Sequence, residues 1–183
     1  MNATVPEYSV DELLSNSWDK KIADDIADEL RTFSGEHRRT LPEMRRFFAV
    51  KGYRELLSAA QAARQGRSSH EALRWVAHAM REYALARPGI SAAAFRNPTT
   101  DSPEWREAHA QLREFMISLF AECGLNGRAA DEALHILRSL VRGFVLHEVM
   151  DSFLSTYSYG ESFDKAMDVF IAGLPVLMKD SDR

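Results

Sequence analysis

Histidines are the residues of this chain with the widest chemical range, because imidazole binds metal ions and transfers protons near neutral pH. Six occur among the 183 residues. His135 and His147 share one stretch of helical periodicity, where their spacing places them about 18 Å apart, too far to hold one metal ion within a chain. His78 and Glu82 have i, i+4 spacing, which is more typical of a surface hydrogen bond than of a catalytic pair.

No other catalytic arrangement has support in the sequence. The chain shows no Ser/His/Asp order, glycine-rich phosphate loop or carboxylate pair in a supporting context. Cys123 is the single cysteine, which excludes an intramolecular disulfide and a cysteine-based zinc site. We therefore expect a protein that is not an enzyme and that carries no metal or other cofactor.

Basic residues gather just after an acidic stretch near the start of the chain. Residues 1–40 contain five Lys or Arg against nine Asp or Glu, and the whole chain carries a net charge of −4. DNA binding would therefore have to come from a local basic patch. The alternative is a solvated face that offsets the acidic residues of 19–29. The candidate DNA-contacting residues are Arg31, Ser34, His37, Arg38, Arg39, Arg45 and Arg46.

Aromatic and methionine side chains recur on several helical stretches, where they could line a pocket between helices. For each of them taken alone, packing in the core is the simpler interpretation. A ligand held there would be small and mostly apolar, with Tyr83, His78 or His147 available for hydrogen bonds. The candidate ligand-binding residues are Trp75, His78, Met80, Tyr83, Phe95, Phe115, Met116, Phe120, Phe144 and His147.

The composition is that of an ordinary soluble protein, with 45% hydrophobic and 27% charged residues. No apolar run approaches the roughly 20 residues of a membrane span, and the amino terminus lacks the basic and apolar blocks of a signal peptide. A single cysteine fits a reducing compartment. We expect a cytoplasmic protein with no membrane partner.

Capping and proline signals divide the chain into helices, and no strand pattern occurs. The segment Thr40–Glu43 forms a capping box that starts a helix to about Gln65, and Ser68–Glu71 forms a second that starts a helix to about Ala86. The other predicted helices span 10–15, 19–30, 90–95, 103–124, 129–154 and a last stretch from 161 to 178. The chain is therefore predicted to be all-α.

The longest predicted helix, Ala129–Leu154, has apolar residues on two faces. A helix of that kind packs against its own domain on one side and a partner on the other. Gly143 lies in its middle, where glycine costs roughly 1 kcal/mol relative to alanine, so we expect a close helix–helix approach there. Together with Glu161–Met178, this helix predicts a homodimer joined by a four-helix bundle. The candidate interface residues are Leu137, Leu140, Val141, Gly143, Phe144, Phe163, Met167, Phe170 and Leu174.

Four segments together resemble the ligand-binding and dimerisation body of the TetR family of bacterial transcriptional regulators. These segments are Leu41–Leu57, Glu71–Phe95, Leu137–Glu148 and Glu161–Leu174. The resemblance covers residues 41–178 and implies a TetR-like helical bundle. It also implies a dimeric, ligand-responsive transcriptional regulator, expected to be a repressor. For the aromatic and methionine residues as a group, it places a ligand pocket on an equal footing with simple core packing. Arg142 stands where one subgroup of the family has a histidine before the glycine.

In this family a small three-helix head carries a helix-turn-helix that docks in the DNA major groove. Here His37 and Leu41 keep the family's spacing, whereas the turn glycine and the Leu-Tyr pair of the recognition helix are not evident. The resemblance thus divides the chain into a diverged head, 1–40, and a body, 41–183. Two functions stay open. One is a regulator that binds a double-stranded DNA operator, and the other is a TetR-like dimer that binds a ligand or a partner and has lost DNA binding.

Overall fold

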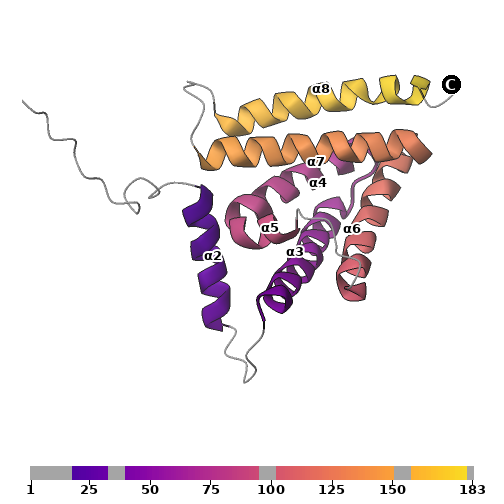
Figure 1. Cartoon of the computed structure of the whole chain (residues 1–183). Coiled ribbons are helices and arrows are strands. Elements are labelled where there is room, and N and C mark those ends of the chain that lie inside the picture. The colour runs from indigo at the N-terminus through magenta and orange to yellow at the C-terminus, as the bar shows by residue number, and fades with distance from the viewer. Residues whose placement is uncertain (1–17, 33–39, 95–101, 151–157, 181–183) are drawn as a thin grey trace, which may run out of the picture.

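A computed structural model describes residues 18–32, 40–94, 102–150 and 158–180, and within them it contains helices and no strand (Figure 1). The predicted all-α fold is therefore confirmed. The predicted helix at 10–15 lies outside the described residues. The helices are α2 (Trp18–Thr32), α3 (Leu41–Arg64), α4 (Ser69–Ala86), α5 (Pro88–Ala94), α6 (Pro103–Glu122), α7 (Gly127–Val149) and α8 (Tyr159–Asp180).

Helix α3 lies at the centre of the body, where it contacts α4, α5 and α6. Helices α4 and α6 both contact α7, and α7 contacts α8. Figure 1 shows α7 and α8 side by side across one end of the molecule, while α2 stands at the flank and contacts α5. The last turn of α2 and the first turn of α3 lie at the opposite end from α7 and α8 (Figure 1).

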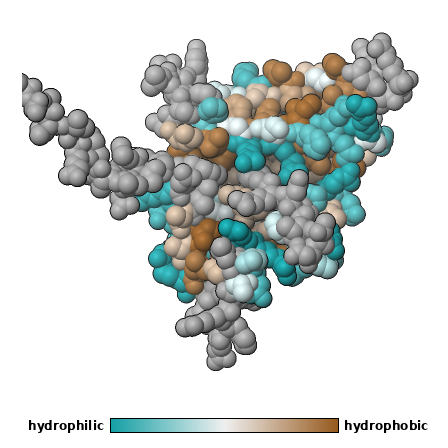
Figure 2. Space-filling view, viewed as in Figure 1, coloured by the Kyte–Doolittle hydropathy of each residue, from teal (hydrophilic) through white to brown (hydrophobic). Residues whose placement is uncertain are grey.

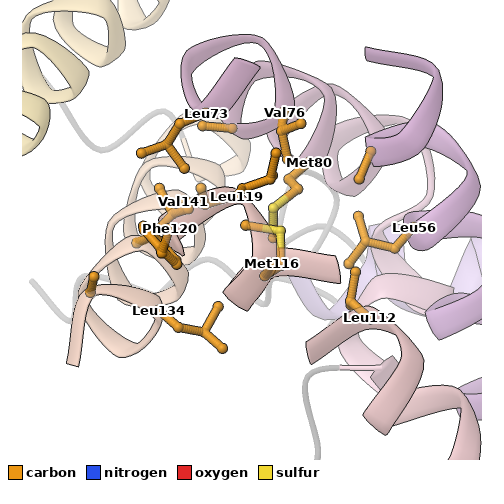
Figure 3. Close-up of a cluster of buried hydrophobic side chains, with 14 of the residues drawn as sticks. Leu56, Leu73, Val76, Met80, Leu112, Met116, Leu119, Phe120, Leu134 and Val141 are labelled. Atoms are coloured by element: carbon orange, nitrogen blue, oxygen red, sulfur yellow. The ribbon is translucent and has the colours of Figure 1, made fainter. Parts of the chain in front are cut away.

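Large apolar side chains from five helices form one continuous core. Leu73, Phe120 and Phe163, from α4, α6 and α8, have no exposed surface. Each such side chain contributes about 1.5–3 kcal/mol when it leaves water, so these residues tie the helices to one another. Figure 3 shows part of this core, with the labelled residues Leu56, Leu73, Val76, Met80, Leu112, Met116, Leu119, Phe120, Leu134 and Val141.

The first predicted capping box is present, and the second is replaced. The backbone N–H and the hydroxyl of Thr40 both donate to Glu43 Oε2, at 2.7 and 2.8 Å, and α3 begins at the next residue. Helix α4 begins at Ser69, but no side chain of its own caps it. Instead the carboxylate of Glu122, at the end of α6, accepts the backbone N–H of Ser69 at 3.2 Å. The start of α4 is therefore fixed by a distant partner rather than by Glu71.

Helices α3 and α5 cross at Gly52, closely enough that no side chain fits between them. A Cβ atom at Gly52 would lie 2.7 Å from the carbonyl oxygen of Ile90 and 2.9 Å from Cβ of Ala94. Both distances are shorter than van der Waals contact. Glycine is therefore required for α5 to lie where it does.

Replacing Gly52 by alanine is expected to lower the free energy of unfolding by roughly 1–3 kcal/mol, the usual cost of overpacking. This loss opposes helix propensity, which favours alanine over glycine by about 1 kcal/mol. Ser58→Ala is the matched control, because Ser58 is exposed on the same helix. Chemical denaturation measures both variants. A Gly52→Ala variant more stable than the wild type would show that the position of α5 does not depend on this glycine.

Candidate functional site

The acidic residues of α2 face the body of the protein as well as solvent. Asp25 accepts hydrogen bonds from the backbone N–H groups of Gly89 and Ile90, at 2.8 and 3.0 Å, and from Nε of Arg87 at 2.9 Å. The two amides belong to the first turn of α5, whose N–H groups have no partner within the helix. Asp25 therefore fastens α2 to the start of α5.

Glu29 makes a second attachment one turn further along α2. Its carboxylate pairs with Lys51 of α3 and with Arg87, and its side chain is only 13% exposed. The hydrogen bond from Lys51, together with the positive charge of Arg87, holds the pKa of Glu29 below its ordinary value, although burial opposes the shift. Arg87, the residue that follows α4, thus pairs with both Asp25 and Glu29 and attaches α2 to the end of α4. Asp24 and Asp28 face solvent, whereas Asp25 and Glu29 are largely occupied by contacts with the body.

The structure describes three of the seven candidate DNA-contacting residues. Arg31 is exposed and pairs with Asp28, one turn earlier in α2. Arg45 is exposed on the first turns of α3, and Arg46 beside it is half-buried and lines a surface groove of mixed charge. Arg31 belongs to the last turn of α2, and Arg45 and Arg46 lie near the start of α3; these two helix ends are opposite α7 and α8 (Figure 1). The other four candidates, Ser34, His37, Arg38 and Arg39, lie outside the described residues.

A small cavity lies between α3, α4, α5, α6 and α7. Its volume is about 30 Å³, which holds one or two water molecules and is about a tenth of an ordinary ligand pocket. Figure 3 labels five of the apolar side chains that line it, Leu56, Met80, Leu112, Met116 and Leu134. Its full lining is Tyr53, Leu56, Met80, Ala94, His109, Leu112, Arg113, Met116, Leu134 and Arg138.

The polar side of this cavity carries more positive than negative charge. The Tyr53 ring meets the His109 ring edge to face, with centroids 5.3 Å apart. Burial raises the pKa of the Tyr53 hydroxyl, and the positive charge of nearby Arg138 opposes the rise. Arg113 pairs with Asp131, whereas no carboxylate in the described part of the chain forms an ion pair with Arg138. Burial, followed by the charges of Arg138 and Arg113, lowers the pKa of His109, which keeps that imidazole neutral.

The ten candidate ligand-binding residues do not form one site. Met80 and Met116 line the cavity, and Phe95 lies outside the described residues. Trp75 is 48% exposed, with the Arg67 guanidinium 4.4 Å from its ring centroid, so it belongs to the surface. His147 is exposed as well.

The remaining candidates have other partners. Nε2 of His78 lies 2.9 Å from Asp164 Oδ1, and the Tyr83 hydroxyl donates to Glu55 at 2.9 Å. The rings of Phe120 and Phe144 pack against aromatic side chains of α8, and Phe115 packs at the edge of the core. Core packing, the simpler interpretation, therefore holds for most of these residues.

Sequence reasoning missed the polar lining of the cavity. His109 and Arg113 lie beside the buried stripe of α6, which runs through Trp105, Leu112 and Met116. Polar residues beside such a stripe were a usable signal, because they face a partly buried space. Tyr53 and Arg138 had no comparable signal, since their convergence depends on how α3 and α7 pack.

Apolar and small residues form a stripe on the outer side of α7 and α8. Ile136, Gly143 and Met150 follow at seven-residue spacing, about two helical turns, so Ile136 and Gly143 share one side of α7 and Met150, the residue after its end, continues that side. Val169 and Val176 have the same spacing on α8. The four apolar side chains are 44–73% exposed, and Figure 2 shows hydrophobic atoms along this end of the molecule. We call these five residues, together with Gly173, the α7/α8 face.

Most of the predicted interface residues lie on the other side of these helices. Leu140 and Phe144 are half-buried and pack against the chain's own core, and Gly143 alone belongs to the α7/α8 face. Apolar periodicity does not reveal which apolar side of a helix meets the chain's own core. For six residues the prediction assigned the core-facing side to the dimer interface. These six, nearly or fully buried within the single chain, are Leu137, Val141, Phe163, Met167, Phe170 and Leu174.

The predicted close approach at Gly143 is not made within the chain. No atom of another described segment lies within 4 Å of a Cβ built at Gly143, and the same holds for Gly173 on the neighbouring helix. Within the described residues, therefore, no helix uses the space beside these two glycines.

A comparison with known protein families identifies the family to which this chain belongs. The family model described as tetracyclin repressor-like, C-terminal domain, matches residues 73–170, which is more than half of the chain. The chain belongs to the TetR family. The resemblance seen in the sequence is thereby confirmed for the body.

Two individual proteins similar to this TetR-family chain are informative. An uncharacterized HTH-type transcriptional regulator of Mycobacterium tuberculosis is 28% identical over 136 residues, which cover 72% of this chain and 62% of the relative. The chain thus matches about three fifths of that relative's length. A solved structure of a protein with unknown function from Rhodococcus sp. RHA1 superposes with a TM-score of 0.69 over 91% of this chain and 95% of that one. At 16% identity this likeness supports the fold alone.

The described residues contain neither a membrane-spanning helix nor a group of metal ligands. No helix among them is both long enough and apolar enough to cross a membrane. Within the same residues, no three His, Cys, Asp or Glu side chains are grouped so that they could hold a metal ion.

The attachment of α2 is testable by replacing Asp25 with alanine. The substitution removes the ion pair with Arg87 and the acceptor for two backbone amides, and a hydrogen bond to a charged group contributes about 1.5–3 kcal/mol. We expect the amides of α2 to exchange with deuterium about 10-fold to 150-fold faster. Asp24→Ala is the matched control, since Asp24 is the exposed neighbour on the same helix. Equal exchange in the two variants would contradict the role assigned to Asp25.

Proposed function

We propose that this chain is a dimeric, ligand-responsive transcriptional regulator of the TetR type, acting as a repressor. The observation that carries the proposal is the exposed α7/α8 face on a chain whose body matches the TetR C-terminal domain. Exposed apolar side chains of this size, aligned along two adjacent helices, are typical of a protein interface. The absence of any catalytic arrangement in the sequence agrees with a regulator.

A second copy of the chain is the partner that this surface fits. A two-fold axis would bring α7 and α8 of one protomer against the same helices of the other, which gives the four-helix bundle expected from the sequence. Gly143 and Gly173 leave room for a close approach of the helices, because no atom of the described residues lies within 4 Å of a Cβ built at either position. An obligate interface of this kind buries roughly 2,000 Å² or more.

DNA binding by the dimer rests on the family and on a few basic residues. The Mycobacterium tuberculosis relative carries a helix-turn-helix name, and this chain keeps Arg31 and Arg45 exposed at the end away from the α7/α8 face. Arg38 and Arg39 lie between them in the sequence. Since the protein as a whole is acidic, contacts from these residues to the phosphates would have to supply the attraction.

One observation favours the second function, a TetR-like dimer that binds a ligand or a partner without binding DNA. In the part of residues 1–40 that the structure describes, α2 is the one helix, and it packs on the body through Asp25 and Glu29. A recognition helix has to project from the body to enter the major groove. A helix held against the body by half-buried ion pairs, as α2 is, is poorly placed for that task.

The dimer is testable by a charge placed on the α7/α8 face. In the wild type we expect a dimer at micromolar concentration by light scattering. Val169→Glu should produce a monomer, because Val169 is 73% exposed in the single chain and would be buried in the dimer. Ala62→Glu is the matched control, since Ala62 is exposed on α3, and it should remain dimeric. A monomeric wild type would contradict the proposal.

The choice between the two functions is testable by the salt dependence of DNA binding. With two to four phosphate contacts in each head, the slope of log affinity against log salt is expected to be roughly −4 to −7 per dimer. Replacing Arg38 and Arg39 by alanine should flatten the slope by about 2 to 4 and weaken binding to all sequences alike, whereas Arg128→Ala on α7 should change neither. If the protein binds no duplex from the region upstream of its own gene at ~50 mM salt, the second function, a dimer that binds a ligand or a partner but not DNA, is the correct one.

A further inference from the structure

We propose that the cavity between α3, α4, α5, α6 and α7 binds a small apolar monocarboxylate, with the carboxylate at Arg138 and the apolar part between Met80 and Met116. This inference rests on the proposed ligand response and adds to it the chemical class of the ligand. The candidate residues drawn from the sequence included the two methionines but none of the polar groups.

The first argument is an uncompensated positive charge. Arg138 is half-buried and lines the cavity together with the neutral side chain of Tyr53. Arg113, the other cation of the lining, already pairs with Asp131. A partly buried guanidinium is stabilised by a negative partner, and among the described residues none is paired with Arg138. A bound carboxylate supplies that charge, and its two oxygens match the fork of the guanidinium.

The second argument concerns the neutral groups beside Arg138. His109 and Tyr53 face the same space with their ring centroids 5.3 Å apart. Burial and the neighbouring arginines lower the pKa of His109, so the imidazole is neutral and available to accept or donate a hydrogen bond. Because an anion next to an imidazole favours its protonated form, binding of a carboxylate should raise the pKa of His109.

The third argument is the apolar remainder of the lining. Leu56, Leu112 and Leu134 surround the cavity together with Met80 and Met116 (Figure 3), and no carboxylate is among the described residues of the lining. A cationic ligand would therefore meet Arg113 and Arg138 and no described negative partner. A volume of about 30 Å³ admits no ligand of this class unless side chains move. Methionine is unbranched and adapts its shape to its surroundings, so Met80 and Met116 are the side chains that would turn aside.

The binding test uses the full wild-type chain and three probes of equal length and different head group: octanoate, octanol and octylamine. Calorimetric titration should give an affinity for octanoate at least tenfold higher than for either of the others. Octanol binding as tightly as octanoate, or no octanoate binding by the folded protein at millimolar concentration, would overturn the proposal. DNA takes no part in this titration, so a protein that binds octanoate but no duplex would contradict the regulator alone.

The residue that carries the proposal is tested by Arg138→Gln, with Arg128→Gln as the matched control on the exposed side of the same helix. Arg138→Gln should weaken octanoate binding at least tenfold, and Arg128→Gln should leave it unchanged. Arg138→Lys keeps the charge and should recover part of the affinity. Equal binding by all three variants would overturn the assignment.

A measurement on the wild type keeps the test independent of any variant that fails to fold. In a titration followed by NMR, saturating octanoate should raise the pKa of His109, while that of exposed His70 stays the same. A pKa of His109 that falls or does not move on binding would place the carboxylate elsewhere.

Discussion

The close contact between α3 and α5 at Gly52 is the constraint on which the arrangement of this protein depends. Helix α5 has only seven residues and is too short to be stable by itself. Gly52 lets its backbone rest directly on α3, while Asp25 of α2 accepts two amides at its other end. Its last residue, Ala94, lines the cavity. One short helix therefore touches the centre of the body, the head and the cavity.

The charged residues of α2 and those of the cavity differ in whether they are paired. Acidic residues of α2 are neutralised by Arg87 and Lys51, so the head is attached through charge pairs that are largely protected from water. The cavity has the opposite character, because Arg138 faces it without an ion pair in the described chain. Because Ala94 of α5 lines the cavity and the first turn of α5 donates to Asp25, we propose that a ligand in the cavity affects α2 through α5, without touching α2.

Local signals in the sequence predicted much of the fold and little of the cavity. The capping box at Thr40 and the glycine and proline boundaries placed the helices, because such signals act within one turn. Glu122 at the start of α4 could not be predicted in this way, since it comes from another helix. The same reason explains Leu137 and Met167, which were assigned to the interface and are core residues.

At the candidate site, too, local signals were readable in the sequence and contacts between distant helices were not. Met80 and Met116 were recognisable as residues that adapt to a ligand, whereas Tyr53 and Arg138 meet only because α3 and α7 pack across the cavity. Asp25 was interpreted by its charge, and its function as a partner of the α5 amides depends on a contact 64 residues away. Family membership, by contrast, was visible in the sequence because it depends on the pattern of the whole body.

Hydrogen exchange of the wild-type protein, with and without saturating octanoate, tests most directly the claim that α5 connects the cavity to the head. Octanoate is expected to slow exchange in the helices that line the cavity, α5 among them, and also to change exchange in α2, which does not line it. A change confined to α3, α4, α5, α6 and α7, with α2 exchanging as before, would contradict the claim.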